Sequence, residues 1–155
     1  MTNQATYDDA NLCLRLYELR REEKLREARE WFGGNFKAKT MDDLMKLAPF
    51  GSKENAYFRM VVSYWDMAAT FVTSGVVNKE LFMQTQGELV FTWERIRELA
   101  PAFREAMKNP MAWKNLETVG NDFIEFMKSK GPETYASFQA LVHGLVKDKE
   151  AAQAR

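Results

Sequence analysis

The sequence predicts an all-α fold, a single-domain helical bundle of five or six helices around a central apolar helix at about residues 53–73. Two observations predict it. Apolar residues recur at spacings of three and four along most of the chain, which is the period of an amphipathic helix. No stretch shows the alternation of apolar and polar residues between turn signals that a β-hairpin would show.

A chain of 155 residues is long enough for one domain with a substantial core. No repeat, linker or low-complexity tract divides it. We therefore expect one helical domain over residues 1–150, followed by a frayed C-terminal tail at 151–155.

The first helix is expected over residues 7–32. Thr6 and Asp9 have the spacing of a capping box at its start, in which each side chain accepts a hydrogen bond from the backbone N–H of the other residue. Gly33 and Gly34 follow its end, where glycine commonly stops a helix. Its second half, "RREEKLREARE", is highly charged, which is typical of a solvent-exposed face.

Cap residues mark the next two helices. Thr40 precedes a short helix over 41–48, and Ser52 precedes a long helix over 53–73. Gly75 suits the left-handed conformation that commonly closes a helix. Helices are expected further on at about 78–99, 101–108 and 109–131, and from 133 onwards.

The apolar helix at 53–73 carries one polar stripe, formed by Arg59, Ser63, Asp66, Thr70 and Thr73. Their 4-3-4-3 spacing places them on one narrow edge of a helix. Two interpretations follow. The stripe is the edge of a core helix that reaches water, or it lines a polar groove in which Arg59, Ser63 and Asp66 bind a small ligand.

Aromatic residues gather around the end of the first helix and the loop after it, at Trp31, Phe32, Phe36 and Phe50. They either cover one end of the bundle or form an interface with a second subunit. Because the apolar helix at 53–73 also has more apolar circumference than a few neighbours cover, we expect a homodimer.

Composition excludes several partners. Lys and Arg together number 22, as do Asp and Glu, so the neutral chain has no general attraction for nucleic acid. Residues 56–77 are long enough to span a bilayer but carry Arg59 and Asp66, so no membrane insertion is expected. The N-terminus lacks the pattern of a secretory signal, and a cytoplasmic location is expected.

The sequence nominates no catalytic residue. Cys13 and His143 are the one cysteine and the one histidine, which excludes a Cys/His zinc cluster. His143 also lacks the glutamate three residues earlier that a di-iron bundle requires. No phosphate-binding or nucleophile motif occurs. We therefore expect no metal and no cofactor, and the sequence argues against an enzyme.

The chain also resembles a known family. It has an acidic residue, Asp66, in an apolar helix, then "SGVVNKELF" as a connection, a helix with Trp93, and a late aromatic helix. Over about residues 31–130 it resembles a family of bacterial helical proteins catalogued as domain of unknown function 4760. The resemblance implies an all-α fold and a bacterial source, and it carries no activity.

Two functions remain open at the level of sequence. The first is a non-enzymatic protein-interaction module that associates with itself or with an unidentified protein partner. The second is a small-molecule binder or enzyme that uses the groove along Arg59, Ser63 and Asp66.

Overall fold

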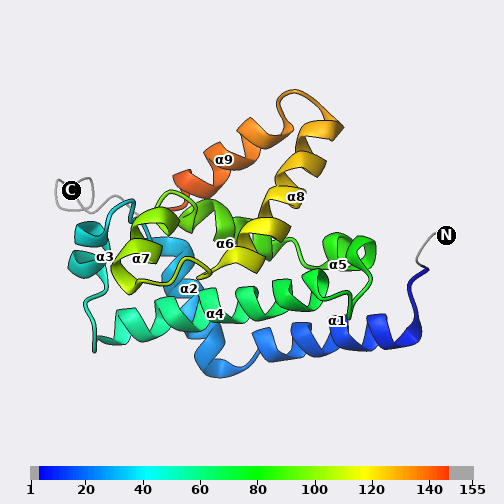
Figure 1. Cartoon of the computed structure of the whole chain (residues 1–155), viewed down its shortest axis with the longest axis horizontal. Helices are drawn as coiled ribbons and strands as arrows, with labels where there is room; N and C mark the ends of the chain where they lie inside the picture. The colour runs from blue at the N-terminus through cyan, green and yellow to red at the C-terminus, as the bar shows by residue number, and fades with distance from the viewer. Residues whose placement is uncertain (1–3, 147–155) are drawn as a thin grey trace.

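The computed structural model describes residues 4–146, and this part of the chain is a single all-α domain with nine helices and no strand (Figure 1). The helices are α1 (Tyr7–Arg20), α2 (Glu23–Asn35), α3 (Met41–Leu47), α4 (Lys53–Thr73), α5 (Lys79–Thr85), α6 (Glu88–Ile96), α7 (Ala100–Met107), α8 (Lys114–Lys130) and α9 (Thr134–Gly144). The tail expected at 151–155 lies outside the described residues.

Helix α4 is the scaffold of the fold. It packs most extensively against α2 and α8 and also contacts α6. Its start follows from Ser52, whose Oγ accepts a hydrogen bond from the Asn55 amide at 3.0 Å. Its end is followed by Gly75 at φ 76°, in the left-handed region that glycine adopts without strain. Trp65, at its middle, is fully buried.

The helix expected over 7–32 is broken into α1 and α2. The break falls at Glu22, which leaves helical geometry (φ −59°, ψ 138°). Its carboxylate accepts from the amides of Lys24 and Leu25 at 3.1 and 2.9 Å, so a glutamate acts as the N-cap of α2. Packing explains the break, because α1 contacts α5 whereas α2 packs on α4. Figure 1 shows α2 turning away from the line of α1.

The helix expected over 78–99 is also broken, at Gln86 and Gly87, which separate α5 from α6. The side chain of Gln86 is buried, and its Nε2 donates to the backbone carbonyl of Cys13 on α1 at 3.4 Å. The two breaks add two helices to the seven ranges expected along the chain. The described residues therefore hold nine helices, more than the five or six expected for the bundle.

Helix α8 begins at Lys114, five residues after the start that Asn109 and Pro110 predict. Residues 110–113 form a turn instead. Trp113 takes a left-handed conformation (φ 61°) that is rare for a residue with a side chain. Its indole stacks on Phe103 with ring centroids 4.0 Å apart and is nearly buried, and this packing offsets the backbone strain.

Helices α6 and α8 approach each other closely in the core. A Cβ added at Gly120 on α8 would lie 2.4 Å from Cδ1 of Trp93 on α6. The indole Nε1 of Trp93 donates to Asn121 Oδ1 at 3.0 Å, which fixes the ring. Glycine at position 120 is therefore a requirement of packing.

Helices α8 and α9 form an antiparallel helical hairpin (Figure 1). Helix α9 also contacts α6. Few apolar side chains hold α9. Val142 is its one buried residue within the described range, and Leu141 and Leu145 are exposed. Polar contacts from α6 supply much of the remaining attachment.

Candidate functional site

The three residues expected to line a groove on α4 do not form a common site. Arg59 is exposed, and its Nε donates to Asn55 Oδ1 one turn earlier at 3.0 Å. Ser63 is also exposed and lies along a shallow cavity whose lining includes neither Arg59 nor Asp66. Asp66 is half-buried and faces α8. The groove interpretation therefore receives no geometric support.

Asp66 caps the N-terminus of α8. Its Oδ1 accepts a hydrogen bond from the backbone amide of Leu116 at 3.1 Å. No side chain at the start of α8 itself makes this bond, because Trp113 occupies the cap position. A carboxylate also interacts favourably with the positive end of the helix dipole. Burial is nevertheless the largest influence and raises the pKa of Asp66, against the opposing effects of the Leu116 amide and Arg104.

Thr70 and Thr73, at the C-terminal end of the polar stripe, also contact the start of α8. Asn115, in the first turn of α8, donates from Nδ2 to Thr70 Oγ1 at 3.0 Å. The Thr73 hydroxyl in turn lies 2.9 Å from Asn115 Oδ1. From Asp66 to Thr73 the stripe is therefore a seam between α4 and α8, while Arg59 and Ser63 face solvent.

This arrangement makes the identity of residue 66 testable. We expect Asp66→Ala to lower the free energy of unfolding by about 1 kcal/mol, the usual cost of removing a helix cap. Asp66→Asn keeps an oxygen acceptor for the Leu116 amide and should stay within about 1 kcal/mol of wild type at neutral pH. Urea denaturation followed by circular dichroism measures both changes.

The pH dependence follows from the raised pKa of Asp66. A carboxyl whose folded-state pKa is raised adds stability below its ordinary value, here 3.8, and loses that contribution as the pH rises through the folded-state pKa. The free energy of unfolding of the wild type should therefore rise relative to that of Asp66→Asn when the pH is lowered toward 3.8. A large loss in Asp66→Asn at neutral pH would contradict this account, because the charge would then be what holds α8.

Two of the four aromatic residues expected at an interface are buried within the monomer. Phe32 and Phe36 are fully buried and stack with centroids 4.8 Å apart, and Phe36 stacks in turn on Phe58 at 5.2 Å. Trp31 is half-buried beside them, and Phe50 is exposed. Phe32 and Phe36 are therefore not available to a partner, and this cluster covers one end of the bundle.

An exposed apolar face lies elsewhere, on the outer side of α1. Its large residues are Tyr7, Leu14 and Tyr17, with exposed fractions of 81, 60 and 49%. With the partly exposed Ala10 they are spaced 3-4-3, so they form one stripe. The buried Cys13 and Leu16 lie on the adjoining side of α1. The analysis of the sequence did not identify this face, although its period is visible there.

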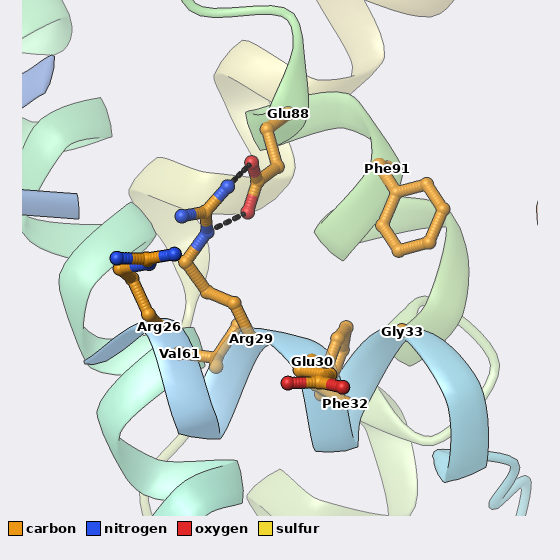
Figure 2. A pocket seen from close by; sticks show the side chains of 8 residues that line it. All are labelled: Arg26, Arg29, Glu30, Phe32, Gly33, Val61, Glu88 and Phe91. Atoms are coloured by element: carbon orange, nitrogen blue, oxygen red, sulfur yellow. Dashed lines mark hydrogen bonds and ion pairs between the residues drawn. The ribbon is translucent and has the colours of Figure 1, made fainter. Parts of the chain in front are cut away.

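A groove of about 450 Å³ lies between α2 and α6. Figure 2 shows its walls: α2 contributes Arg26, Arg29, Glu30 and Gly33, and α6 contributes Glu88 and Phe91, while Val61 of α4 and Phe32 lie at its base.

An ion pair bridges one end of this groove. Arg29 binds Glu88 with two parallel hydrogen bonds, from Nε to Oε1 at 2.7 Å and from Nη2 to Oε2 at 2.6 Å (Figure 2). Arg20 donates to the same Oε2 at 3.2 Å. The hydrogen bonds to Glu88 are the main cause that raises the pKa of Arg29. This bidentate geometry fixes the spacing of α2 and α6.

Arg95, which is nearly completely buried, bridges α6 to the ends of two helices. Its Nη1 donates to the carbonyls of Phe32 and Phe36, and its Nη2 donates to that of Gly33, at 2.9, 3.2 and 2.8 Å. Nη2 and Nε both donate to the carbonyl of Val142 on α9, at 2.8 and 3.2 Å. Burial lowers the pKa of Arg95 to about 10, which leaves the guanidinium charged at neutral pH.

Glu94, the preceding residue, is buried and holds α9 from the other side. Its carboxylate accepts from the Tyr135 hydroxyl at 2.6 Å and from Gln139 Nε2 at 3.1 Å, and it lies 3.1 Å from His143 Nε2. Burial would raise the pKa of Glu94, but these contacts and Arg97 together hold it below its ordinary value. His143, for which the sequence offered no ligand partner, therefore belongs to a structural contact between α6 and α9.

Comparisons with known families give one finding. The family model described as "Domain of unknown function (DUF4760)" matches residues 5–123. The match therefore includes α1, which the expected range of 31–130 left out, and ends within α8. No curated protein and no solved structure matches the chain. No helix within residues 4–146 combines the length and apolar character needed to cross a membrane.

Proposed function

We propose that this chain, which belongs to the DUF4760 family of unknown function, is a non-enzymatic interaction module that associates with a second copy of itself through the outer face of α1. The observation that supports this proposal is the apolar stripe of Tyr7, Leu14 and Tyr17, which is exposed in the monomer. The stripe widens the apolar surface of α1 beyond the side that the monomer buries, and an exposed apolar surface of this kind favours association.

The charges at the two ends of α1 favour a second copy as the cover. Asp8 lies in the first turn, and Arg21 follows the last turn, both exposed. When two copies of α1 pack antiparallel about a twofold axis at Leu14, Tyr7 of each copy approaches Arg21 of the other. The Asp8 carboxylate in the same turn as Tyr7 adds negative potential at that end. The two helix dipoles are antiparallel in this arrangement, which is electrostatically favourable. One self-complementary patch serves both subunits.

The size of the stripe sets the expected affinity. Each of the six large side chains in the pair contributes about 1–2 kcal/mol when its remaining exposed surface is buried. The loss of translational and rotational freedom costs about 4–15 kcal/mol. At the favourable ends of both ranges the gain exceeds the cost by about 8 kcal/mol. That limit corresponds to a dissociation constant on the order of micromolar and to a dimer that exchanges with monomer, and this is the strength we propose.

Leu14→Glu should convert the protein to a monomer, because it places two carboxylates against each other on the twofold axis. Sedimentation equilibrium across a dilution series measures the mass relative to the 18.0 kDa of one chain. Met111→Glu is the matched control, since Met111 is 70% exposed and lies far along the chain, in the turn before α8. This control should dimerise like wild type.

Two results would count against the proposal. A wild-type mass of one chain at concentrations of about tens of micromolar would exclude a dimer of the expected strength. A dimer that persists in Leu14→Glu but is lost in Met111→Glu would place the interface elsewhere.

A further inference from the structure

We propose that the groove between α2 and α6 binds a free α-amino acid with an apolar or aromatic side chain. The groove shown in Figure 2 is independent of the outer face of α1, so this inference does not rest on self-association. Its volume of about 450 Å³ is within the range of small-ligand sites and exceeds what one amino acid needs.

The groove is held open by polar bridges at both ends. Arg29 of α2 binds Glu88 of α6 at one end, and Arg95 of α6 binds the carbonyls of Phe32 and Gly33 of α2 at the other. Both helices rest on α4 between these bridges. Because the bridges are short and multivalent, they keep the two walls apart and preorganise the space between them.

The base and one wall of the groove are apolar. Phe91 projects from α6 on the opposite side of the open space from Arg29, as Figure 2 shows, and Val61 and Phe32 lie at the base. On the α2 wall, Gly33 leaves the space empty, since a Cβ added there would meet no atom within 4 Å. An apolar side chain of a ligand would fit between Phe91 and Gly33 and exclude water from this surface.

The mouth carries one cation and one anion, each without a bound partner. The side chains of Arg26 and Glu30, one turn apart on α2, are exposed and make no hydrogen bond or ion pair within the described part of the chain. The other two charged groups of the lining, Arg29 and Glu88, neutralise each other.

A zwitterion complements this pair of open charges. Its carboxylate would bind the guanidinium of Arg26, and its ammonium would bind the carboxylate of Glu30. The Arg20 guanidinium, held by Glu88 nearby, adds positive potential at the same end as Arg29 and favours the carboxylate there. The chemistry that matches the whole groove is therefore an apolar side chain joined to a zwitterionic backbone.

The test uses L-phenylalanine as the probe, with 3-phenylpropionate and phenethylamine as analogues that lack the ammonium and the carboxylate. Binding to the full chain is followed by amide chemical-shift changes on titration. We expect L-phenylalanine to bind about tenfold more tightly than either analogue, because only the amino acid satisfies both charges. The shifted amides should be those of α2 and α6.

Gly33→Leu should abolish binding, because a Cβ at position 33 meets no atom within 4 Å and the leucine side chain would extend into the groove. Leucine also favours the helix more than glycine does. Ala106→Leu, on the exposed surface of α7, is the matched control and should bind like wild type. Glu30→Gln should weaken binding of L-phenylalanine but leave 3-phenylpropionate unchanged.

Failure of L-phenylalanine to bind up to its solubility limit would overturn the proposal, as would binding that survives in Gly33→Leu. Equal affinity for L-phenylalanine and 3-phenylpropionate would reject the role assigned to Glu30. Circular dichroism of each variant separates loss of the groove from loss of the fold.

Discussion

Arg95→Met should lower the free energy of unfolding by about 3–4 kcal/mol. The methionine fills much of the space of the arginine stem but donates no hydrogen bond. It removes a donor from four carbonyls: those of Gly33, Phe36 and Val142 lose the hydrogen bond from Arg95 altogether, whereas that of Phe32 keeps the Phe36 amide. Each buried acceptor left unsatisfied costs about 1–3 kcal/mol, and water entering from the groove offsets part of the sum.

Urea denaturation measures this loss, and hydrogen exchange localises it. The amides of α9 should exchange faster in Arg95→Met than in wild type, because Val142 is the residue through which Arg95 reaches α9. Arg15→Met, at an exposed arginine of α1, is the control and should change stability by less than about 0.5 kcal/mol. Equal stability of Arg95→Met and Arg15→Met would mean that the guanidinium is dispensable.

Gly120→Ala should be destabilising by about 3 kcal/mol, although alanine is the better helix former. The new Cβ would lie 2.4 and 2.5 Å from Cδ1 and Cγ of the Trp93 ring and 2.8 Å from its Cβ. A different ring rotamer cannot relieve the contact with Cβ, so α6 and α8 must move apart. Thermal and urea unfolding of the variant measure the effect.

Gly33→Ala provides the matched control for this substitution. Gly33 is also helical, but a Cβ there meets no atom within 4 Å, so alanine should be neutral or stabilising by about 0.5–1 kcal/mol. The double variant Trp93→Leu/Gly120→Ala should lose less stability than the sum of the losses in the two single variants, because the smaller side chain relieves part of the clash. Wild-type stability of Gly120→Ala would show that α6 and α8 are not in close contact.

The elements with local signals were predictable from the sequence. The expected bounds of 53–73 coincide with α4, because Ser52 caps its start and Gly75 follows its end. The capping box of Thr6 with Asp9 is present as the spacing predicts. Thr40 caps its helix as expected and forms a second capping box with Asp43. In each case the interactions that set the boundary lie within three residues of it.

The breaks depend on contacts between distant segments and were not predictable in the same way. Glu22 is an ordinary helix former, and nothing in its neighbours marks it as an N-cap. It leaves the helix because α1 and α2 pack on different partners. The second break carried a signal in Gly87, but the anchor that fixes it is the bond from Gln86 to the Cys13 carbonyl.

The candidate sites likewise divide into features with a local signal in the sequence and features that depend on contacts between distant segments. The polar stripe on α4 was visible in the sequence, yet the carboxylate of Asp66 is directed at an amide 50 positions later. The groove between α2 and α6 combines residues from three helices and has no motif. The outer face of α1, in contrast, has a visible period in Tyr7, Leu14 and Tyr17 and could have been predicted from it.

The cap that Asp66 provides for α8 also bears on the order of folding. Because the first turn of α8 has no side-chain cap of its own, its start is fixed when a loop of about 50 residues has closed. Contacts of such long sequence separation form late in most small domains. The loss in Asp66→Ala should therefore appear as faster unfolding, with the refolding rate unchanged, in stopped-flow measurements. A slower refolding rate would instead place the docking of α8 on α4 within the folding nucleus.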